Sequence, residues 1–502
     1  MGVLAADTLQ GPKIGWLELS PLLVLLGGAM VLLVVAALTP VWPKRWYATF
    51  SAAVALGSLG LCFPLWHRID VDGPKLLVGN AMHFDHMSVW VIATISVAVF
   101  LASLVTDDYL RREGLDGPEI YALYMMAAIG GIVMGSANDL VVLFLGLEIL
   151  SIALYVLAAS HRKRIQSQES GLKYFVLGGV SSAIFLYGVA LIYGGTGSTN
   201  FDRILSALSQ SLPLTRPGDD AMLLAGVALL LVGLAFKVAA VPFHFWAPDV
   251  YEGAPTPVSG FMASAAKAAA FAAMLRVLLE ALPNFSNDYR PVVWVLAAIT
   301  ILGGSMMAVV QTNVKRMLAF SSVSHAGFML VGVEAASRTA GGVANDGRSS
   351  VLLYTMIYSV LALGTWGVVT AVGRTGDGAT DLGAFRGLGR ARPALAMGMT
   401  VLLLAQAGVP LTAGFIAKFG VIRAAVDADS NVLAVVAMAA AVIAAYLYLR
   451  IMISMWIAEP EAGDDAREQV RVPAYLNIGI TLAVAFTLVV GFFPDWLVSL
   501  AP

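Results

Sequence analysis

The amino-acid sequence predicts an all-α polytopic membrane protein with about 14 transmembrane helices. Apolar residues make up 59% of the 502-residue chain and charged residues 12%, and the mean hydropathy is +0.83. Soluble domains carry about 25% charged residues, so this composition leaves little room for a soluble domain. The single cysteine, Cys62, lies in an apolar run. It excludes disulfides within the chain and cysteine-ligated zinc or iron–sulfur sites.

The predicted spans are apolar runs of about 20 residues, the length that crosses the hydrocarbon core as a helix. In chain order they are residues 19–39, 47–65, 85–105, 118–136, 139–159, 169–194, 219–253, 257–281, 291–311, 317–335, 350–373, 393–427, 430–458 and 473–496.

Lysine and arginine residues in the short loops predict the orientation of these spans. One set of alternate loops contains most of them, including Arg111 and Arg112, Arg162 to Arg164, and Lys315 and Arg316. The loops between them contain fewer. Because positively charged loops remain in the cytoplasm, both termini are predicted on the outer side of the membrane.

Two spans, 219–253 and 393–427, are too long for one straight crossing. Each would measure roughly 51 Å as a continuous helix, against a hydrocarbon core of about 30 Å. A Val-Pro pair lies near the middle of each span, at 241–242 and 409–410. Proline lacks the N–H that would bond the carbonyl four residues earlier. The sequence therefore predicts a break in each helix.

The carbonyls of Val238 and Gln406 lose their helical partners at these breaks. An ordinary proline kink would explain a single break. However, each break has a lysine within about two turns, Lys237 before the first and Lys418 after the second. Freed backbone at membrane depth is tolerated where it lines a hydrated cavity, so the paired pattern favours a functional path.

The breaks lie in the seventh and twelfth spans, which therefore cross the membrane in opposite directions. This arrangement is typical of inverted-topology repeats with a path at the membrane midplane. We predict four regions: 1–117, an N-terminal three-helix extension; 118–281, the first repeat, spans 4 to 8; 282–458, the second, inverted repeat, spans 9 to 13; and 459–502, the C-terminal span.

Ionisable residues inside the apolar spans predict a path for protons. One charged side chain at the bilayer centre costs about 2.5–3.5 kcal/mol, so such groups are expected to face one another, water or a partner. Glu148 and Lys267 lie near the middle of their spans, and Lys237, His244 and Lys418 lie beside the breaks.

Lysine suits proton transfer better than ion binding. A low-dielectric site disfavours the charged form of a lysine, and a nearby carboxylate favours it. Movement of Glu148 relative to Lys237 would therefore load or release a proton. A sodium or calcium site needs clustered carboxylates and carbonyls. The freed carbonyls at the breaks leave sodium as an alternative coupling ion.

Two candidates have an alternative interpretation. Lys173 lies nearer the cytoplasmic end of its span, where its ammonium either joins the path or extends to the lipid headgroups. His325 follows Ser321, Ser322 and Ser324, and is either a relay residue or a hydrogen-bonded packing residue.

The group His83, Asp85 and His86 begins the third span and would suggest a metal site. We expect ordinary helix capping there, because aspartate favours a helix start. No metal site is predicted.

Three stretches resemble the antiporter-like membrane subunits of respiratory complex I, which share an ancestor with subunits of multi-subunit cation/proton antiporters. The stretches are FKVAAVPFHFWAPDVYEGAPTPVSGFMASAAKAAAF (236–271), KRMLAFSSVSHAGFMLVG (315–332) and AGVPLTAGFIAKF (407–419). The N subunits are the most similar branch. Lys418 stands where the M subunits have glutamate, and 169–201, which includes Lys173, looks characteristic of N subunits. With fourteen predicted spans, we expect no lateral helix of the kind that extends the L subunits.

The resemblance implies a role for each candidate residue. Glu148 matches the glutamate that modulates the lysine of the first break, Lys237. His244 and Lys267 match the bridge along the central hydrophilic axis, and Lys418 matches the lysine that releases protons to the outside. Lys173 matches an additional lysine near the glutamate, and His325 matches part of the axis or of the second half-channel.

The resemblance also implies a division of labour. NADH, flavin, iron–sulfur clusters and quinone are expected on other subunits, and this chain is expected to bind no cofactor. The implied partners are the M subunit, small K, J and A subunits and lipids, with no nucleic acid, in a bacterial inner membrane. A subunit of a cation/proton antiporter or of a membrane-bound hydrogenase is the alternative.

Overall fold

The computed structural model describes residues 14–39, 45–115, 117–210, 219–338, 346–459, 470 and 472–502. Parts of the predicted N-terminal and C-terminal regions, 1–13 and 460–469, lie outside these ranges.

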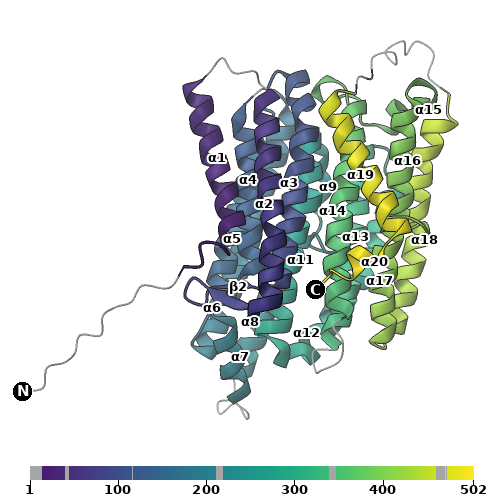
Figure 1. Cartoon of the computed structure of the whole chain (residues 1–502). Coiled ribbons are helices and arrows are strands. Elements are labelled where there is room, and N and C mark those ends of the chain that lie inside the picture. The colour runs from purple at the N-terminus through teal and green to yellow at the C-terminus, as the bar shows by residue number, and fades with distance from the viewer. Residues whose placement is uncertain are drawn as a thin grey trace, which may run out of the picture.

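The described chain is a bundle of long helices that run up and down side by side (Figure 1). The helices up to the first break are α1 (Ser20–Leu38), α2 (Arg45–Asp72), α3 (His86–Glu113), α4 (Pro118–Ser136), α5 (Leu140–Ala158), α6 (Ile165–Thr196), the short α7 (Phe201–Gln210) and α8 (Asp219–Val238). After the break come α9 (Trp246–Gly253), α10 (Thr256–Phe261), α11 (Lys267–Arg276), α12 (Ser286–Val309), α13 (Val314–Arg338), α14 (Asp346–Val372), α15 (Leu388–Ala391), α16 (Pro393–Ala407), α17 (Ala413–Asp427), α18 (Asn431–Trp456), α19 (Ala474–Phe492) and α20 (Asp495–Val498).

The predicted membrane fold is confirmed. Within the described residues, 13 helices are long and apolar enough to cross a membrane, and α16 is a shorter apolar helix. One small feature was not predicted: strands β1 (Lys75–Leu77) and β2 (Met82–Phe84) form an antiparallel hairpin before α3.

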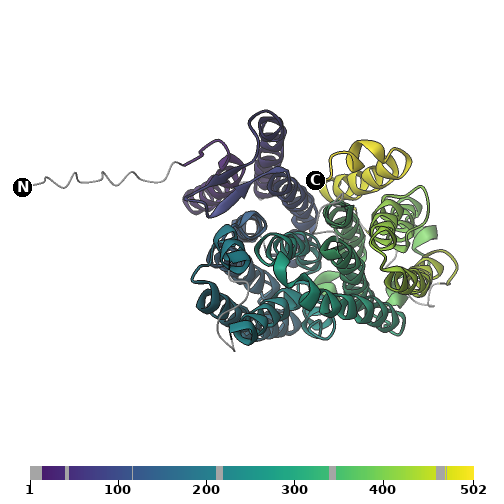
Figure 2. The same ribbon diagram turned by 90° about the horizontal axis from the view of Figure 1, so that it is seen from below.

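The centre of the bundle is made by α13 and α14. Their most apolar stretches are completely buried, whereas only 22% of the corresponding stretch of α1 is buried. Seen along the helices, α1 and α2 in purple and α19 in yellow lie at the edge of the bundle (Figure 2). An ionisable residue on α13 or α14 is therefore shielded from lipid by other helices.

Both predicted helix breaks are present. α8 ends at Val238 and α9 begins at Trp246, so the chain is non-helical around Pro242. α16 ends at Ala407, and α17 begins at Ala413 beyond Pro410. A third departure was not predicted: the helix from α10 to α11 contains a π-helical stretch, Met262–Ala266, directly before Lys267.

Loops that are predicted to share the cytoplasmic side meet at one end of the bundle. The fully buried Asp377 carboxylate accepts hydrogen bonds from Arg164 Nη1 (2.9 Å), Lys315 Nζ (3.1 Å) and Thr256 Oγ1 (2.8 Å). Arg112 Nη2 lies 3.9 Å from the same carboxylate. Burial raises the pKa of Asp377, but Lys315 and Arg164 beside it hold that pKa below its ordinary value. This ionic cluster joins α3, α6, α10 and α13.

A second ionic cluster lies at the opposite end. The buried guanidinium of Arg276 donates to Asp85 (2.7 and 2.8 Å) and to Glu280 (2.9 Å). Burial raises the pKa of Asp85, but Arg276 beside it holds that pKa well below its usual range. Asp85 also accepts from Ser88 N at the start of α3 (2.8 Å), which confirms the predicted helix cap.

Candidate functional site

Lys237 is buried at the end of α8, directly before the first break. Its Nζ donates to Ser151 Oγ on α5 (2.7 Å) and lies 5.7 Å from the centre of the Tyr174 ring on α6. The side chain is 5% exposed. The structure thus holds this ammonium between three helices with one hydroxyl and one aromatic face, contacts that stabilise a cation.

Glu148 lies three residues before Ser151 on α5, so the two side chains share one face of that helix. Its carboxylate interacts electrostatically with Lys237, although no ion pair within 4.0 Å joins them in the described structure. Glu148 Oε1 is buried, and among the described residues it has no hydrogen-bond partner. Burying an oxygen without a hydrogen-bond partner costs free energy. The Glu148 carboxylate can therefore accept a proton or a hydrogen bond from water.

Two local features position Glu148. Asp139 caps the start of α5 by accepting from the backbone N–H groups of Val141 and Val142. Gly146 lies directly against α4, where an added Cβ would come within 2.6 Å of Met134 N. The small residue permits close helix packing, which fixes the depth and rotation of the helix that carries the carboxylate.

The first break is stabilised by contacts to neighbouring helices. Trp246 Nε1 donates to the carbonyl of Phe236 (3.1 Å), and the N–H of Val241 donates to Thr300 Oγ1 on α12 (2.9 Å). His244 is half-buried in this segment, with its ring centre 6.3 Å from that of Phe320 on α13. In the described part of the chain, no hydrogen bond joins His244 to Lys237 or Lys267, and His244 Nδ1 is buried without a partner.

Lys267 begins α11, directly after the π-helical stretch, and is 2% exposed. Its Nζ donates to the backbone carbonyl of Ser322 on α13 and lies 6.0 Å from the centre of the Tyr358 ring. π-Helical turns are frequent at functional sites. Here the turn directly precedes the lysine that contacts the central helix.

His325 is buried one turn further along α13, between the two halves of the site. Its Nδ1 forms a hydrogen bond with the Tyr354 hydroxyl (2.7 Å), and its Nε2 forms one with the Tyr448 hydroxyl (3.1 Å). Both Lys267 and Lys418 interact electrostatically with the ring. Because both nitrogens have phenol partners, the ring can pass a proton through hydroxyl groups on either side.

Lys418 lies on α17, directly after the second break. Its Nζ donates to the carbonyl of Ala407 at the end of α16 (2.9 Å), and it lies 4.7 Å from the centre of the Phe328 ring. The lysine thus bonds the carbonyl next to that of Gln406, the carbonyl predicted to lose its helical partner to Pro410.

Lys173 occupies a different environment from the other lysines. Its side chain is 41% exposed, and its Nζ forms ion pairs with Glu169 (2.8 Å) and Asp249 (2.9 Å). Arg316 also pairs with Asp249 and with Glu252. Lys173 therefore belongs to an ionic group at the end of the bundle, and its contacts are with these carboxylates rather than with Glu148.

The sequence analysis named serines beside His325 but missed three other hydroxyl groups of the site, those of Ser151, Tyr354 and Tyr448. Ser151 could have been predicted, since it follows Glu148 by three residues and therefore lies on the same face of one helix. Tyr354 and Tyr448 lie on α14 and α18, far from His325 in sequence, and only the packing of the helices brings them to it. Among the described residues, no group of three His, Cys, Asp or Glu side chains could hold a metal ion.

The fold and these residues define a polytopic membrane protein in which buried lysines adjoin two broken helices. A family model described as NADH:quinone oxidoreductase/Mrp antiporter, TM, matches residues 137–444. The chain belongs to this family, which confirms the resemblance seen in its motifs.

Individual relatives agree with this assignment. NADH-quinone oxidoreductase subunit N 3 of Streptomyces griseus is 39% identical over 534 aligned residues, which cover 99% of this chain and 95% of the relative. A chain of respiratory complex I from Thermus thermophilus has a TM-score of 0.76 at 29% identity, with 96% of this chain and 99% of that chain covered. A chain of the Mrp complex from Dietzia sp. has a TM-score of 0.81 at 21% identity, with 97% and 96% covered. That last likeness shows the fold alone.

Proposed function

We propose that this chain is the proton-translocating membrane subunit of a bacterial NADH:quinone oxidoreductase, of the N type. The observation that carries the proposal is the row of buried lysines, Lys237, Lys267 and Lys418, each beside a helix break or a π-helical turn. Its relatives along the full length are named as subunit N, which favours this function over an antiporter or hydrogenase subunit. Redox cofactors and quinone would be held by other subunits.

The proposed path begins at Glu148 and Lys237, continues past His244 to Lys267, and reaches Lys418 through His325. Glu148 would control the protonation of Lys237 by its charge, since a nearby carboxylate favours the ammonium form. The His325 ring and the phenols of Tyr354 and Tyr448 that bond it would connect Lys267 with Lys418. In this arrangement Lys418 would release the proton to the outer side.

The proposed organisation follows the order of the helices. Residues 118–281 and 282–458 would form two inverted repeats, each with one broken helix, between an N-terminal extension (1–117) and a C-terminal span (459–502). The end of the bundle that contains the Asp377 cluster would face the cytoplasm, with both termini outside. The M subunit and small K, J and A subunits would be the neighbours in the membrane.

Mild-detergent purification of the tagged chain tests this proposal. We expect it to purify with a large, inhibitor-sensitive NADH:quinone reductase. Purification with only small membrane subunits, without reductase activity, would refute the assignment and favour a cation/proton antiporter. Sodium-dependent transport in vesicles would then be the decisive assay.

Gly408 provides a test of the position of Lys418. This residue has a φ of +91°, and an added Cβ would lie 2.9 Å from Lys418 Cδ. Gly408→Ala should cost roughly 1–3 kcal/mol through backbone strain, lower the melting temperature and move the ammonium away from Ala407, with reduced proton pumping. Gly398→Ala on α16 is the control, because its Cβ would meet only ordinary contacts at 3.6 Å. Equal pumping in both variants would remove the Ala407 contact from the path.

Lys173 is the candidate with the smallest expected effect. Because its ion pairs are partly exposed, each is worth only about 0–1 kcal/mol. Lys173→Ala should therefore leave assembly intact and pumping near the unsubstituted level, measured as proton uptake per NADH oxidised. A loss as large as that of Lys237→Ala would place Lys173 on the path.

A further inference from the structure

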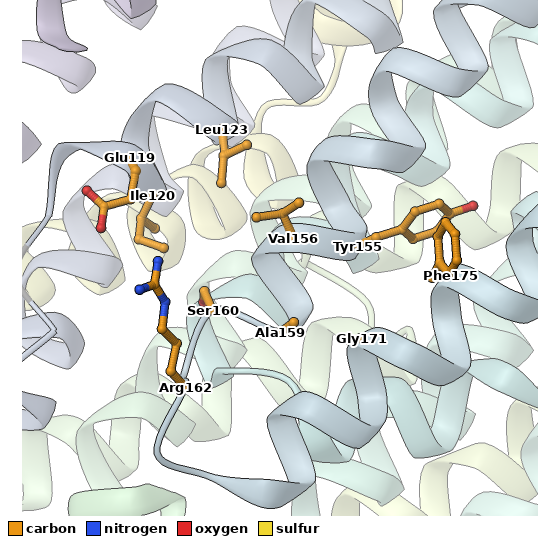
Figure 3. Close-up of a pocket in the computed structure, with 10 residues that line it drawn as sticks. All are labelled: Glu119, Ile120, Leu123, Tyr155, Val156, Ala159, Ser160, Arg162, Gly171 and Phe175. Atoms are coloured by element: carbon orange, nitrogen blue, oxygen red, sulfur yellow. The ribbon is translucent and has the colours of Figure 1, made fainter.

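A pocket of about 390 Å³ opens between α4, α5 and α6 at the end of the bundle that contains the Asp377 cluster. Its volume falls within the roughly 300–1,000 Å³ of small-molecule sites. Figure 3 shows Glu119 and Arg162 at one end of the pocket, and Tyr155 and Phe175 at the other. The pocket therefore has a charged end and an apolar end.

The apolar end is open to the surroundings of the bundle. Val156 on α5 is 50% exposed and Phe175 on α6 is 58% exposed. Both lie within membrane-spanning helices, so their exposed surfaces face lipid or a neighbouring subunit. A molecule in the pocket can extend an apolar tail along these two helices.

The charged end has one group of each sign, and neither is paired. Within the described structure, Arg162 and Glu119 form no ion pair within 4.0 Å, either with each other or with any other group. Several other charges at this end of the bundle are paired: Arg164 with Asp377, Arg316 with Asp249, and Lys173 with Glu169.

We propose that this pocket binds the headgroup of an aminophospholipid, a lipid that carries a phosphate and an ammonium. Arg162 would bind the phosphate, since guanidinium groups form strong, charge-assisted hydrogen bonds with phosphate. Glu119 would bind the ammonium, and Ser160, which also lines the pocket, would offer a further hydroxyl. A lipid with a phosphate but no ammonium would meet repulsion from Glu119.

The pocket adjoins the surroundings of Lys237. Tyr155 lines the pocket and packs edge-on against Tyr174, with ring centres 4.8 Å apart. The Tyr174 ring is the one that faces the Lys237 ammonium. A bound lipid would thus stabilise the packing of α5 against α6 beside this lysine. Lipid binding in this pocket needs only the membrane location of the chain and does not depend on the proposed function.

Photo-labelling of the purified intact complex tests the proposal. The probes are phosphatidylethanolamine and phosphatidylglycerol analogues with the same diazirine acyl chain, and adducts are measured on the peptides that contain Val156 and Phe175. We expect phosphatidylethanolamine to label these peptides more strongly. Glu119→Gln should lower that labelling roughly twofold to fivefold, the effect of one exposed ion pair, and leave phosphatidylglycerol labelling unchanged or higher. Arg162→Gln should lower both.

Lys163→Gln is the matched control, because Lys163 is exposed on the same loop and does not line the pocket. Equal labelling by the two lipids in the unsubstituted complex would overturn the proposal, even if a variant failed to assemble. Labelling that Glu119→Gln leaves unchanged would also overturn it. So would a photo-crosslink from position 175 to a neighbouring subunit, since a protein would then cover the pocket.

Discussion

Lys237→Met should abolish proton translocation through this chain while the complex still assembles. Methionine keeps an unbranched apolar stem, one atom shorter than lysine, but removes the ammonium, which donates to Ser151 and interacts with Glu148. Loss of a group that transfers protons typically costs about 10²–10⁴ in rate. The measurement is proton uptake per NADH oxidised in sealed vesicles, with the amount of assembled complex determined in parallel.

The matched control is Lys163→Met, which removes an exposed lysine from the loop between α5 and α6. It should pump normally. If Lys237→Met assembles and pumps as well as the control, Lys237 is not on the path, and the role proposed for Glu148 fails with it.

Asp377→Ala should strongly destabilise the assembled protein. The Asp377 carboxylate is completely buried and accepts from Lys315, Arg164 and Thr256. Removing one partner of a buried ion pair costs about 3–5 kcal/mol, because the remaining charge stays buried without compensation. We expect a lower melting temperature of the purified complex and less of the chain in the membrane. Asp381→Ala, an exposed residue in the same loop, should change neither.

The Asp377 cluster also predicts a pH dependence. The pKa of Asp377 is lower in the folded protein than its ordinary value, so its contribution to stability is present above the ordinary pKa. That contribution is lost as the pH falls towards the folded pKa. The melting temperature should fall on acidification by a smaller amount in Asp377→Asn than in the unsubstituted protein. Parallel curves would contradict this role.

Most of the membrane architecture could be predicted from local sequence. Long apolar runs identify spans because every backbone group at that depth must be bonded within the helix. Pro242 and Pro410 predicted both breaks because proline has no N–H to complete the helical hydrogen bonds. The hairpin of β1 and β2 has strands of only three residues. These are too short to show the alternation of apolar and polar residues that predicts a strand. The π-helical stretch before Lys267 was not predicted, because its sequence, MASAA, carries no breaking residue.

The candidate site was predictable residue by residue but not as a set of contacts. Burial of Lys237, Lys267 and Lys418 followed from their position in apolar spans. Their partners depend on which helices pack together, and a periodic pattern on one helix does not identify its neighbour. The two tyrosines that form hydrogen bonds with His325 were therefore not predicted. For Lys173, depth alone left two interpretations open, and the structure shows partly exposed ion pairs.

The most direct test of the central claim is the number of protons moved per NADH oxidised in sealed vesicles that contain the complex with Lys267→Met. Lys267 is buried beside α13, where its Nζ donates to the Ser322 carbonyl, and it is the middle lysine of the path that we propose. We expect the complex to assemble, to oxidise NADH with quinone, and to move fewer protons per NADH than the unsubstituted complex. An unchanged ratio in a fully assembled complex would show that protons do not cross this chain along the proposed lysine path.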